Sequence, residues 1–512
     1  MALGVCKTIA IDGVVAHLVT VEANIGRGLP GMHVIGSTDT AISQARSRIR
    51  TAASNLGLEW PKTKIVVSMS PAALPKAGAH FDLSLAIAVL SAAVNDASFM
   101  PPETLSRRLD KTLFLGEVGL DGSVRPVPGL LSAVMCAQEH GITTLVIPPG
   151  NAPEAALIHD LTVKVAHTLK EAFLWAIGET ELATVIATSP AAMAPSVDFA
   201  DIAGQKDAKF AAEVAAAGGH HFMLIGPPGA GKSMIAARMP TILPQLTHAQ
   251  TIETTAIHSL TGVLGEVIMR APFIAPHASV TKAALVGGGS GTPRPGAVSL
   301  AHYGILFLDE VSEIPAQILD SLRAPLEDGE IRLSRAARTV QFPARFQLMM
   351  AANPCRCAAE DPASCTCTVR ERINYLKNLS GPLRDRLDMT VHVSGASARI
   401  NTEGEETSAD IAERVAQARE RAVWRWSHRG VDVATNAEVP STFLRKNALA
   451  DDSAMALISA YLAHGELTQR GVDKILKLAW TLADLRDIDR PDIACVADAA
   501  QLRGTGGVHV AV

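Results

Sequence analysis

The chain has 512 residues, of which 48% are hydrophobic, and its formal net charge is −5. This length allows roughly three domains of ordinary size, and the small negative charge means that any binding to an acidic polymer must come from local patches. The first residues alternate apolar and polar side chains, unlike a signal peptide, and no uncharged run is long enough to cross a bilayer. We therefore expect a cytoplasmic protein without a membrane partner.

The first part of the chain, residues 1–186, mixes predicted strands and helices. KIVVSMS at 64–70 indicates a strand before a Pro-broken loop, FDLSLAIAVLSAAV at 81–94 a buried helix, and TTLVI at 143–147 another strand. Residues 187–199 are mostly small and contain prolines, which is typical of a linker. The sequence therefore predicts an α+β domain followed by a linker.

A phosphate-binding motif opens the next region, residues 200–393. The apolar strand HFMLI at 221–225 runs into G-x-x-x-x-G-K-S and then into a helix, which predicts an α/β domain with a parallel sheet. Backbone N–H groups of the glycine-rich loop face the phosphates of ATP, Lys232 reaches the β- and γ-phosphates, and Ser233 can ligate Mg²⁺. The predicted nucleotide-binding residues are Gly226, Pro227, Pro228, Gly229, Ala230, Gly231, Lys232, Ser233 and Met234.

Two further strands complete the predicted nucleotide site. GILFLDEV at 304–311 ends in two carboxylates, of which Asp309 is placed to hold Mg²⁺ and Glu310 to orient or deprotonate the attacking water. FQLMMAAN at 346–353 is a buried strand that ends in Asn353, a side chain able to position that water. Together these residues predict ATP hydrolysis.

A basic hairpin is predicted between these two strands. EIRLS at 330–334 and TVQF at 339–342 alternate in polarity around RAAR, so that Arg332, Arg335 and Arg338 decorate a hairpin. These arginines could contact the phosphate backbone of DNA, form surface ion pairs or contact another subunit. There is little aromatic interleaving, so we expect no stacking on bases and no sequence specificity.

Four of the seven cysteines lie close together in the pattern C-x-C-x₇-C-x-C, as Cys355, Cys357, Cys365 and Cys367. In a reducing compartment such a cluster favours a metal site over disulfides, and four thiolates form a closed, structural Zn²⁺ site. A redox switch is the remaining alternative. A metal here would fix the loop after Asn353; the loop could instead touch DNA through flanking arginines.

The last part of the chain is predicted to be helical. Residues 394–438 combine a polar stretch with the charged helix IAERVAQARERAVWRW, and residues 439–512 show successive helical patterns. We expect a connecting loop and helix followed by a small helical domain.

These motifs, together with GPLRDRLD at 381–388 and LTQRGVDKILKLAWTLADL at 467–485, resemble the AAA+ Mg-chelatase-like family, and within it the ComM/YifB type, over almost the whole chain. The resemblance implies that the helical domain is a lid, Asn353 is sensor 1, Arg386 is the arginine finger and Arg470 is the sensor 2 arginine. Arg384 is an alternative candidate for the arginine finger. A finger acts on the site of a neighbouring subunit, so the resemblance implies a homo-hexamer, with the Gly-rich segment before Asp309 forming an insert that projects into its pore.

The first domain resembles the proteolytic domain of Lon in PAALPKAGAHFDLSLA at 71–86 and LGEVGLDGSVRPVPGLLSA at 115–133. Lon-type cleavage needs a serine activated by a lysine, but the matching positions hold His80 and Leu131. We therefore expect no protease activity, and an assembly or partner-binding module whose partner could be a recombination protein.

The leading hypothesis is an ATP-driven hexameric DNA motor that promotes branch migration of branched or forked DNA in homologous recombination or natural transformation. The family resemblance supplies the branch-migration part; the residues alone predict an ATPase with a basic pore hairpin. The alternative is a Mg-chelatase-type remodelling ATPase that acts on a protein partner. A third class, an ATP-dependent protease, is opposed by the missing serine and lysine.

Overall fold

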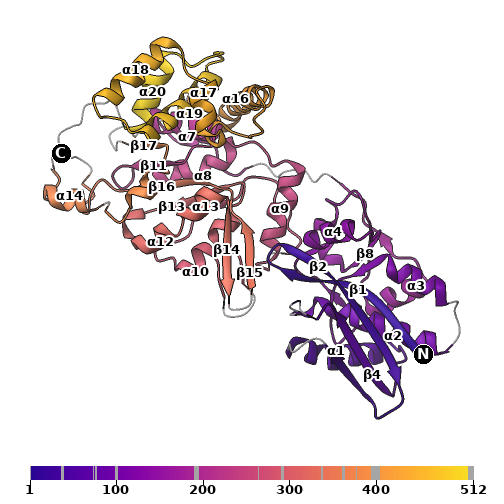
Figure 1. The fold of residues 1–512 in the computed structure, drawn as a ribbon. Helices are drawn as coiled ribbons and strands as arrows, with labels where there is room; N and C mark the ends of the chain where they lie inside the picture. Colours follow the sequence, from indigo (N-terminus) through magenta and orange to yellow (C-terminus); the bar gives the residue numbers. More distant parts are fainter. Residues whose placement is uncertain are drawn as a thin grey trace.

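The computed structural model describes residues 2–35, 40–72, 74, 76, 78–97, 102–188, 195–262, 264–289, 293–335, 338–359, 364–375, 377–393 and 404–504. An N-terminal α/β body lies to one side of a larger body that carries helices α16–α20 at its top (Figure 1). Among these residues, none of the helices combines the length and apolar character that a bilayer crossing requires.

The N-terminal body is built on an eight-stranded mixed sheet in the order β10-β9-β8-β5-β1-β2-β4-β3. Its strands are β1 (Ala2–Asp12), β2 (Val15–Gly26), β3 (Gly31–Ile35), β4 (Lys64–Ser70), β5 (Thr112–Phe114), β8 (Thr144–Ile147), β9 (Thr162–Val165) and β10 (Ala183–Thr184), and β6 (Glu117–Val118) pairs separately with β7 (Val124–Arg125). Its helices are α1 (Thr40–Asn55), α2 (Asp82–Ala97), α3 (Pro102–Asp110), α4 (Leu130–Glu139), α5 (Ala152–Ala155) and α6 (Leu169–Ile177), with single 3₁₀ turns at Ala79–Phe81 and Pro149–Asn151. The strands and helix predicted at 64–70, 81–94 and 143–147 are thereby confirmed.

Successive side chains point to opposite faces of this sheet, and both faces are covered at β1, β5 and β8, whereas alternate residues of β2, β3 and β4 stay partly or wholly exposed. Cys6 and Ala10 of β1 enter the core beneath α1 and α2, whereas Ile9 enters the core beneath α4. The cysteines outside the cluster, Cys6, Cys136 and Cys495, are buried.

The second body has a five-stranded parallel sheet in the order β12-β13-β16-β11-β17. Its strands are β11 (Phe222–Ile225), β12 (Phe273–Ile274), β13 (Ile305–Leu308), β16 (Gln347–Ala352) and β17 (Met389–His392), and a hairpin of β14 (Glu330–Arg335) and β15 (Arg338–Pro343) projects from it (Figure 1). Its helices are α7 (Lys206–Gly218), α8 (Lys232–Ile242), α9 (His248–Ser259), α10 (Lys282–Val286), α11 (Ala297–Leu300), α12 (Ala316–Asp320), α13 (Arg323–Asp328), α14 (Val369–Tyr375) and α15 (Gly381–Arg384), with 3₁₀ turns at Phe199–Asp201 and Val311–Glu313. The strands β11, β13 and β16 are apolar and almost wholly buried, as parallel strands covered on both faces must be.

In the C-terminal region, residues 404–504, the regular elements are all helices. It contains α16 (Ser408–His428), α17 (Ser441–Asn447), α18 (Asp452–Ala463), α19 (Gln469–Leu485) and α20 (Ile493–Arg503), with a 3₁₀ turn at Asn436–Glu438. Residues of α16, α19 and α20 share one apolar core with α7 and α8, which lie on one face of the parallel sheet. This helical region is therefore packed directly against the sheet that carries the predicted phosphate-binding loop.

The two bodies meet at α9 and at the β14–β15 hairpin. Ala256 of α9 belongs to the N-terminal core beneath α4, and the buried carboxylate of Glu154 accepts a hydrogen bond from Gly265 N at 3.0 Å. Gly13, in the turn between β1 and β2, has φ of 66° and lies so close to β15 that a Cβ there would be 2.6 Å from Val340 Cγ1. The N-terminal body thus touches the insert helix and the hairpin.

Candidate active site

The phosphate-binding loop lies between β11 and α8 at the carboxyl end of the parallel sheet. Gly229 and Gly231 have φ of 77° and 82°, a left-handed conformation that glycine adopts without strain. A Cβ on Gly226 would lie 2.4 Å from the carbonyl oxygen of Val393, so this position also requires glycine. The loop leads into the N-terminus of α8, whose amides and dipole favour an anion.

Lys232 joins this loop to the neighbouring strand. Its Nζ donates to the carbonyl oxygens of Gly226 at 2.7 Å and Pro227 at 2.8 Å, and to Asn353 Oδ1 at 3.2 Å. Burial lowers the pKa of Lys232, while the charges of Asp309 and Glu310 oppose that shift. Since β16 lies between β13 and β11, the end of the predicted sensor strand comes directly beside the loop.

The predicted magnesium ligands also lie together. Ser233 Oγ donates to Asp309 Oδ2 at 2.7 Å, and Asp309 Oδ1 accepts from Glu310 N at 2.8 Å. A hydroxyl and a carboxylate are oxygen ligands of the kind that Mg²⁺ prefers, so this pair fits the ion. Glu310 is exposed and has φ of 47°, a left-handed conformation that is uncommon outside glycine and is found at strained functional positions.

Arg386 and Arg470 lie near each other, and each is paired with a carboxylate. Arg386 forms an ion pair with Glu327 of α13, and Arg470 Nη1 lies 3.2 Å from Asp385 Oδ2. Burial, followed by the charges of Arg323 and Arg470, lowers the pKa of Arg386. Within the described part of the chain, neither Arg386 nor Arg470 contacts residues 226–234.

The sequence analysis missed Arg323 and Glu327, which belong to no motif. They lie four residues apart on α13, a spacing that places two side chains on one helix face and was the available signal. Arg384, the rival finger, is exposed at the last residue of α15.

A buried polar network holds the arginine pair in place. Asp388 Oδ1 lies 2.9 Å from Lys474 Nζ, which also donates to Leu387 O, and Asp388 Oδ2 lies 3.2 Å from His220 Nδ1. Burial raises the pKa of Asp388, but the neighbouring cations outweigh it and hold that pKa well below its usual range. Lys474 is one helical turn beyond Arg470, so the network fixes α19 against the segment that carries Arg386.

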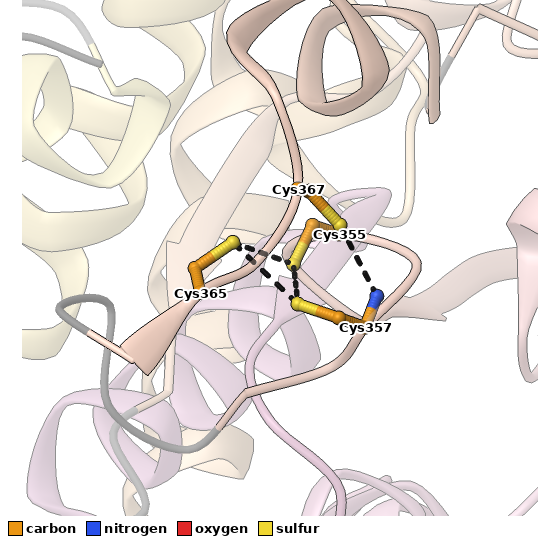
Figure 2. Close-up of side chains that lie close together, drawn as sticks. All are labelled: Cys355, Cys357, Cys365 and Cys367. Atoms are coloured by element: carbon orange, nitrogen blue, oxygen red, sulfur yellow. Dashed lines mark hydrogen bonds between the residues drawn. The ribbon is translucent and has the colours of Figure 1, made fainter.

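The four clustered cysteines converge within the loop after β16 (Figure 2). Their sulfur atoms all lie within 4.8 Å of one another. Cys355 Sγ is 3.3 Å from Cys357 Sγ and 3.6 Å from Cys365 Sγ, and Cys367 Sγ accepts from Cys357 N at 3.4 Å. Four thiolates on one tetrahedral zinc ion are roughly 3.8 Å apart, so the donor set and its spacing fit Zn²⁺.

The hairpin presents one of its three predicted arginines among the described side chains. Arg332 is exposed and pairs with Glu330 on the same strand at 2.5 Å, so it forms the surface ion pair that was one of its alternatives. Arg335 and Arg338 face each other in the strand register, but their side chains and residues 336–337 lie outside the described residues. Val340 and Phe342 of β15 are buried.

The positions that match the catalytic serine and lysine of Lon, His80 and Leu131, do not form a catalytic pair of that kind. His80 is buried, its Nε2 lies 3.1 Å from Ile9 O, and burial lowers its pKa to about 4, so the imidazole is neutral at pH 7. Leu131 lies in the apolar core beneath α4. Lys76, four residues before His80, is 4% exposed, and its Nζ donates to Pro71 O at 2.6 Å.

Family models match three consecutive parts of the chain. Residues 21–151 match the model described as subunit ChlI of Mg-chelatase, residues 198–400 match magnesium chelatase subunit ChlI, and residues 405–503 match its C-terminal part.

Similar proteins extend over nearly the whole chain. An uncharacterised protein of Mycobacterium tuberculosis is 47% identical over 511 residues, 99% of each chain. YifB of Escherichia coli is 36% identical over 96% of this chain and 95% of its own length, and the competence protein ComM of Haemophilus influenzae is 36% identical over 95% and 94%. The N-terminal region is also similar to part of the Lon protease of Mycolicibacterium smegmatis, 27% identical over 158 residues, which are 30% of this chain and 19% of that protease.

Proposed function

Because the chain belongs to the AAA+ Mg-chelatase-like family of the YifB and ComM type, we propose that it is an ATP-hydrolysing ring motor that moves DNA through its pore and promotes branch migration. The observation that carries the ATPase part is the contact of three strand ends at one place. Lys232 after β11 reaches Asn353 after β16, and Ser233 reaches Asp309 after β13.

In this proposal Lys232 exchanges its loop carbonyl partners for the β- and γ-phosphate oxygens when ATP binds. Ser233 and Asp309 hold Mg²⁺, which when bound neutralises charge on those phosphates. Asn353 and Glu310 orient the attacking water, and Glu310 accepts its proton; the exposure of this carboxylate leaves it accessible to that water. Asp309, Glu310 and Asn353 follow strand ends, and Lys232 and Ser233 are the first residues of α8, directly after the loop.

The pair of Arg386 and Arg470 supports assembly into a ring of identical subunits. The family resemblance implies that this ring has six subunits. The two arginines lie near each other, and among the described residues neither has a hydrogen bond or ion pair with residues 226–234 of its own chain. Both can therefore be presented to the nucleotide of a neighbouring subunit, where guanidinium groups stabilise charge on the transferred phosphoryl group. Glu327 and Asp385 hold them in the absence of that neighbour.

The DNA part of the proposal rests on the hairpin and on the name of one relative, a competence protein. Six hairpins around a pore would bring their arginines to the phosphate backbone, giving affinity without sequence specificity. The substrate is then branched or forked DNA in recombination or natural transformation, with a recombination protein as the candidate partner of the N-terminal body.

The four-cysteine cluster is proposed to hold a structural Zn²⁺. Cys355, Cys357, Cys365 and Cys367 are its ligands, and a closed four-thiolate site leaves no position for water. The bound ion would fix the loop that begins two residues after Asn353 and precedes α14. This cluster would thereby connect the end of the sensor strand to the segment that carries Arg386.

The deciding experiment measures ATP turnover and unwinding with forked DNA, beside an unfolded protein substrate. We expect forked DNA to raise turnover, and Arg335→Ala with Arg338→Ala to remove that stimulation while basal hydrolysis remains. Lys62→Ala with Lys64→Ala, which removes the same two charges from exposed positions of the N-terminal body, serves as the control. Stimulation by a protein partner and none by DNA would favour the alternative, a Mg-chelatase-type remodelling ATPase.

A further inference from the structure

The helical C-terminal region has an open surface pocket of about 370 Å³, bounded by the C-terminal ends of α16 and α17, by α19 and by the segment before α20. Arg429 follows the last residue of α16, Lys446 and Asn447 end α17, and Trp480 of α19 and Arg490 complete the polar and aromatic lining. The two remaining lining residues are apolar, so the pocket has three cations and no carboxylate. Its volume is in the range of small-molecule sites.

The cations are held in different ways. Arg490 donates from Nε to Leu449 O at 3.0 Å and from Nη2 to Ala450 O at 2.7 Å, which fixes its guanidinium against the backbone. The guanidinium of Arg429 lies 5.4 Å from the ring centroid of Trp480 and 5.5 Å from that of Trp426. Both arginines are thus preorganised, and such ordering lowers the entropy that a ligand must overcome.

The carboxylate of Asp451, near the pocket, already has a hydrogen-bond partner. The carboxylate of Asp451 lies close enough to Arg490 for their charges to interact, but its Oδ1 caps α18 by accepting from Ala454 N at 2.7 Å. Trp480 directs its indole N–H to Ala448 O. Within the described residues, the side-chain contacts of Arg429 are with the two indole rings, and Lys446 has no side-chain hydrogen bond or ion pair.

The simpler explanation is that cations at helix C-termini complement the helix dipoles. It accounts for Arg429 and Lys446, which end α16 and α17, but not for Arg490, which precedes α20. Three like charges around one pocket repel one another unless an anion is shared between them. Guanidinium groups match phosphate oxygens through paired N–H donors, and an ammonium adds a point charge.

We propose that this pocket binds a phosphate-bearing anion, supplied by a free nucleotide or by the backbone of a nucleic acid. The site is separate from the arginines at the ATPase site, because Trp480 lies ten residues beyond Arg470 on α19, roughly 15 Å along the helix. The proposal does not depend on the pore function proposed above.

The test is calorimetric titration of tripolyphosphate, without Mg²⁺, into the full-length chain carrying Lys232→Ala, so that the phosphate-binding loop does not compete. Loss of two charged contacts in Arg429→Gln/Lys446→Gln is expected to weaken binding about tenfold or more. Arg445→Gln, the same charge change one residue before Lys446 but outside the lining, is expected to change it less than about twofold. Because Arg429 also packs on two indoles, Lys446→Gln alone serves as the variant that preserves the fold; it should weaken binding about threefold.

Competition then identifies the source of the phosphate. Displacement of tripolyphosphate by AMP, but not by a short single-stranded oligonucleotide, assigns a nucleotide site; displacement by the oligonucleotide assigns a nucleic-acid contact. Equal tripolyphosphate binding in Lys446→Gln, the double variant and Arg445→Gln would overturn the proposal, and would leave the helix-dipole role as the explanation of the cations.

Discussion

The two bodies of this protein differ in the residues that they hold at the positions where a catalytic group is predicted or aligned. In the second body, Lys232, Asp309 and Asn353 lie at adjacent strand ends and take part in hydrogen bonds that link those ends. In the N-terminal body, the positions aligned with a protease dyad hold a neutral, buried His80 and an apolar Leu131. The predicted nucleotide residues are polar groups bonded to one another, although Lys232 is itself buried, whereas the positions aligned with the protease dyad hold one neutral, buried group and one apolar group.

The bodies also differ in what they need from other chains. The N-terminal sheet is covered on both faces at β1, β5 and β8, with α9 completing one core, so its fold is closed within the chain. The predicted finger and sensor arginines, Arg386 and Arg470, form ion pairs with Glu327 and Asp385, and among the described residues neither has a hydrogen bond or ion pair with residues 226–234. The comparison therefore predicts that ATP turnover depends on a neighbouring subunit, whereas the N-terminal body contributes structure and position.

The largest expected effect comes from removing the arginine supplied to the neighbour. Arg386→Ala should lower turnover by about 10³-fold or more, the range of arginine fingers, while Arg384→Ala changes it little. Mixing Arg386→Ala with Lys232→Ala chains should restore part of the turnover, because an intact loop then meets an intact arginine across a subunit contact. Full activity of Arg386→Ala, or of a preparation that stays monomeric with ATP and DNA, contradicts the trans assignment.

A somewhat smaller loss is expected at the water-activating carboxylate. Glu310→Gln should reduce turnover by about 10²- to 10⁴-fold and leave ATP binding within about twofold, as measured by steady-state rates and by titration of a fluorescent nucleotide. Glu313→Gln, an exposed change of the same kind three residues later, provides the control. If turnover survives in Glu310→Gln, another base acts and the assignment is wrong.

The four-cysteine cluster should act on turnover indirectly. The wild type should bind about one zinc ion per chain, and Cys365→Ser/Cys367→Ser is expected to abolish that binding. Turnover should fall by about ten- to a hundredfold, because the segment that carries Arg386 would no longer be held in place. Metal analysis and sedimentation measure the zinc content and the assembly. Cys136→Ala, a buried cysteine of the N-terminal body, should keep its zinc. Unchanged assembly and turnover in the double variant would favour the redox-switch alternative.

The nucleotide residues were predictable from sequence because each follows a strand directly, so the sheet itself brings them together. GPPGAGKS, LDE and AAN needed only the order of parallel strands to converge. Glu327 and Arg323 could not be found this way, since their role depends on how α13 packs against α15. The contact between the two bodies could not be predicted for a similar reason. In sequence, α9 has the pattern of an ordinary helix, and only the fold places its Ala256 in the core of the N-terminal body.

The smallest effect concerns the contact between the two bodies. Glu154 is fully buried, burial raises its pKa, and its Oε1 accepts from Gly265 N while Oε2 lacks a partner among the described residues. A carboxyl whose pKa is higher in the folded state binds its proton more tightly there, so its contribution to stability is greatest at low pH and is lost as the pH rises above its ordinary value of about 4.3.

Glu154→Gln keeps the acceptor and removes this penalty, so its free energy of unfolding should match that of the wild type at low pH and exceed it at pH 8. Glu154→Ala leaves the N–H of Gly265 unpaired and should cost about 1–3 kcal/mol at pH 8. Urea midpoints at both pH values measure the difference, with Glu179→Gln, an exposed residue of the same body, as the control. A glutamine variant that is less stable at pH 8 would mean that the ionised carboxylate is satisfied in solution and that charge, as in the nucleotide site, has been retained at this contact.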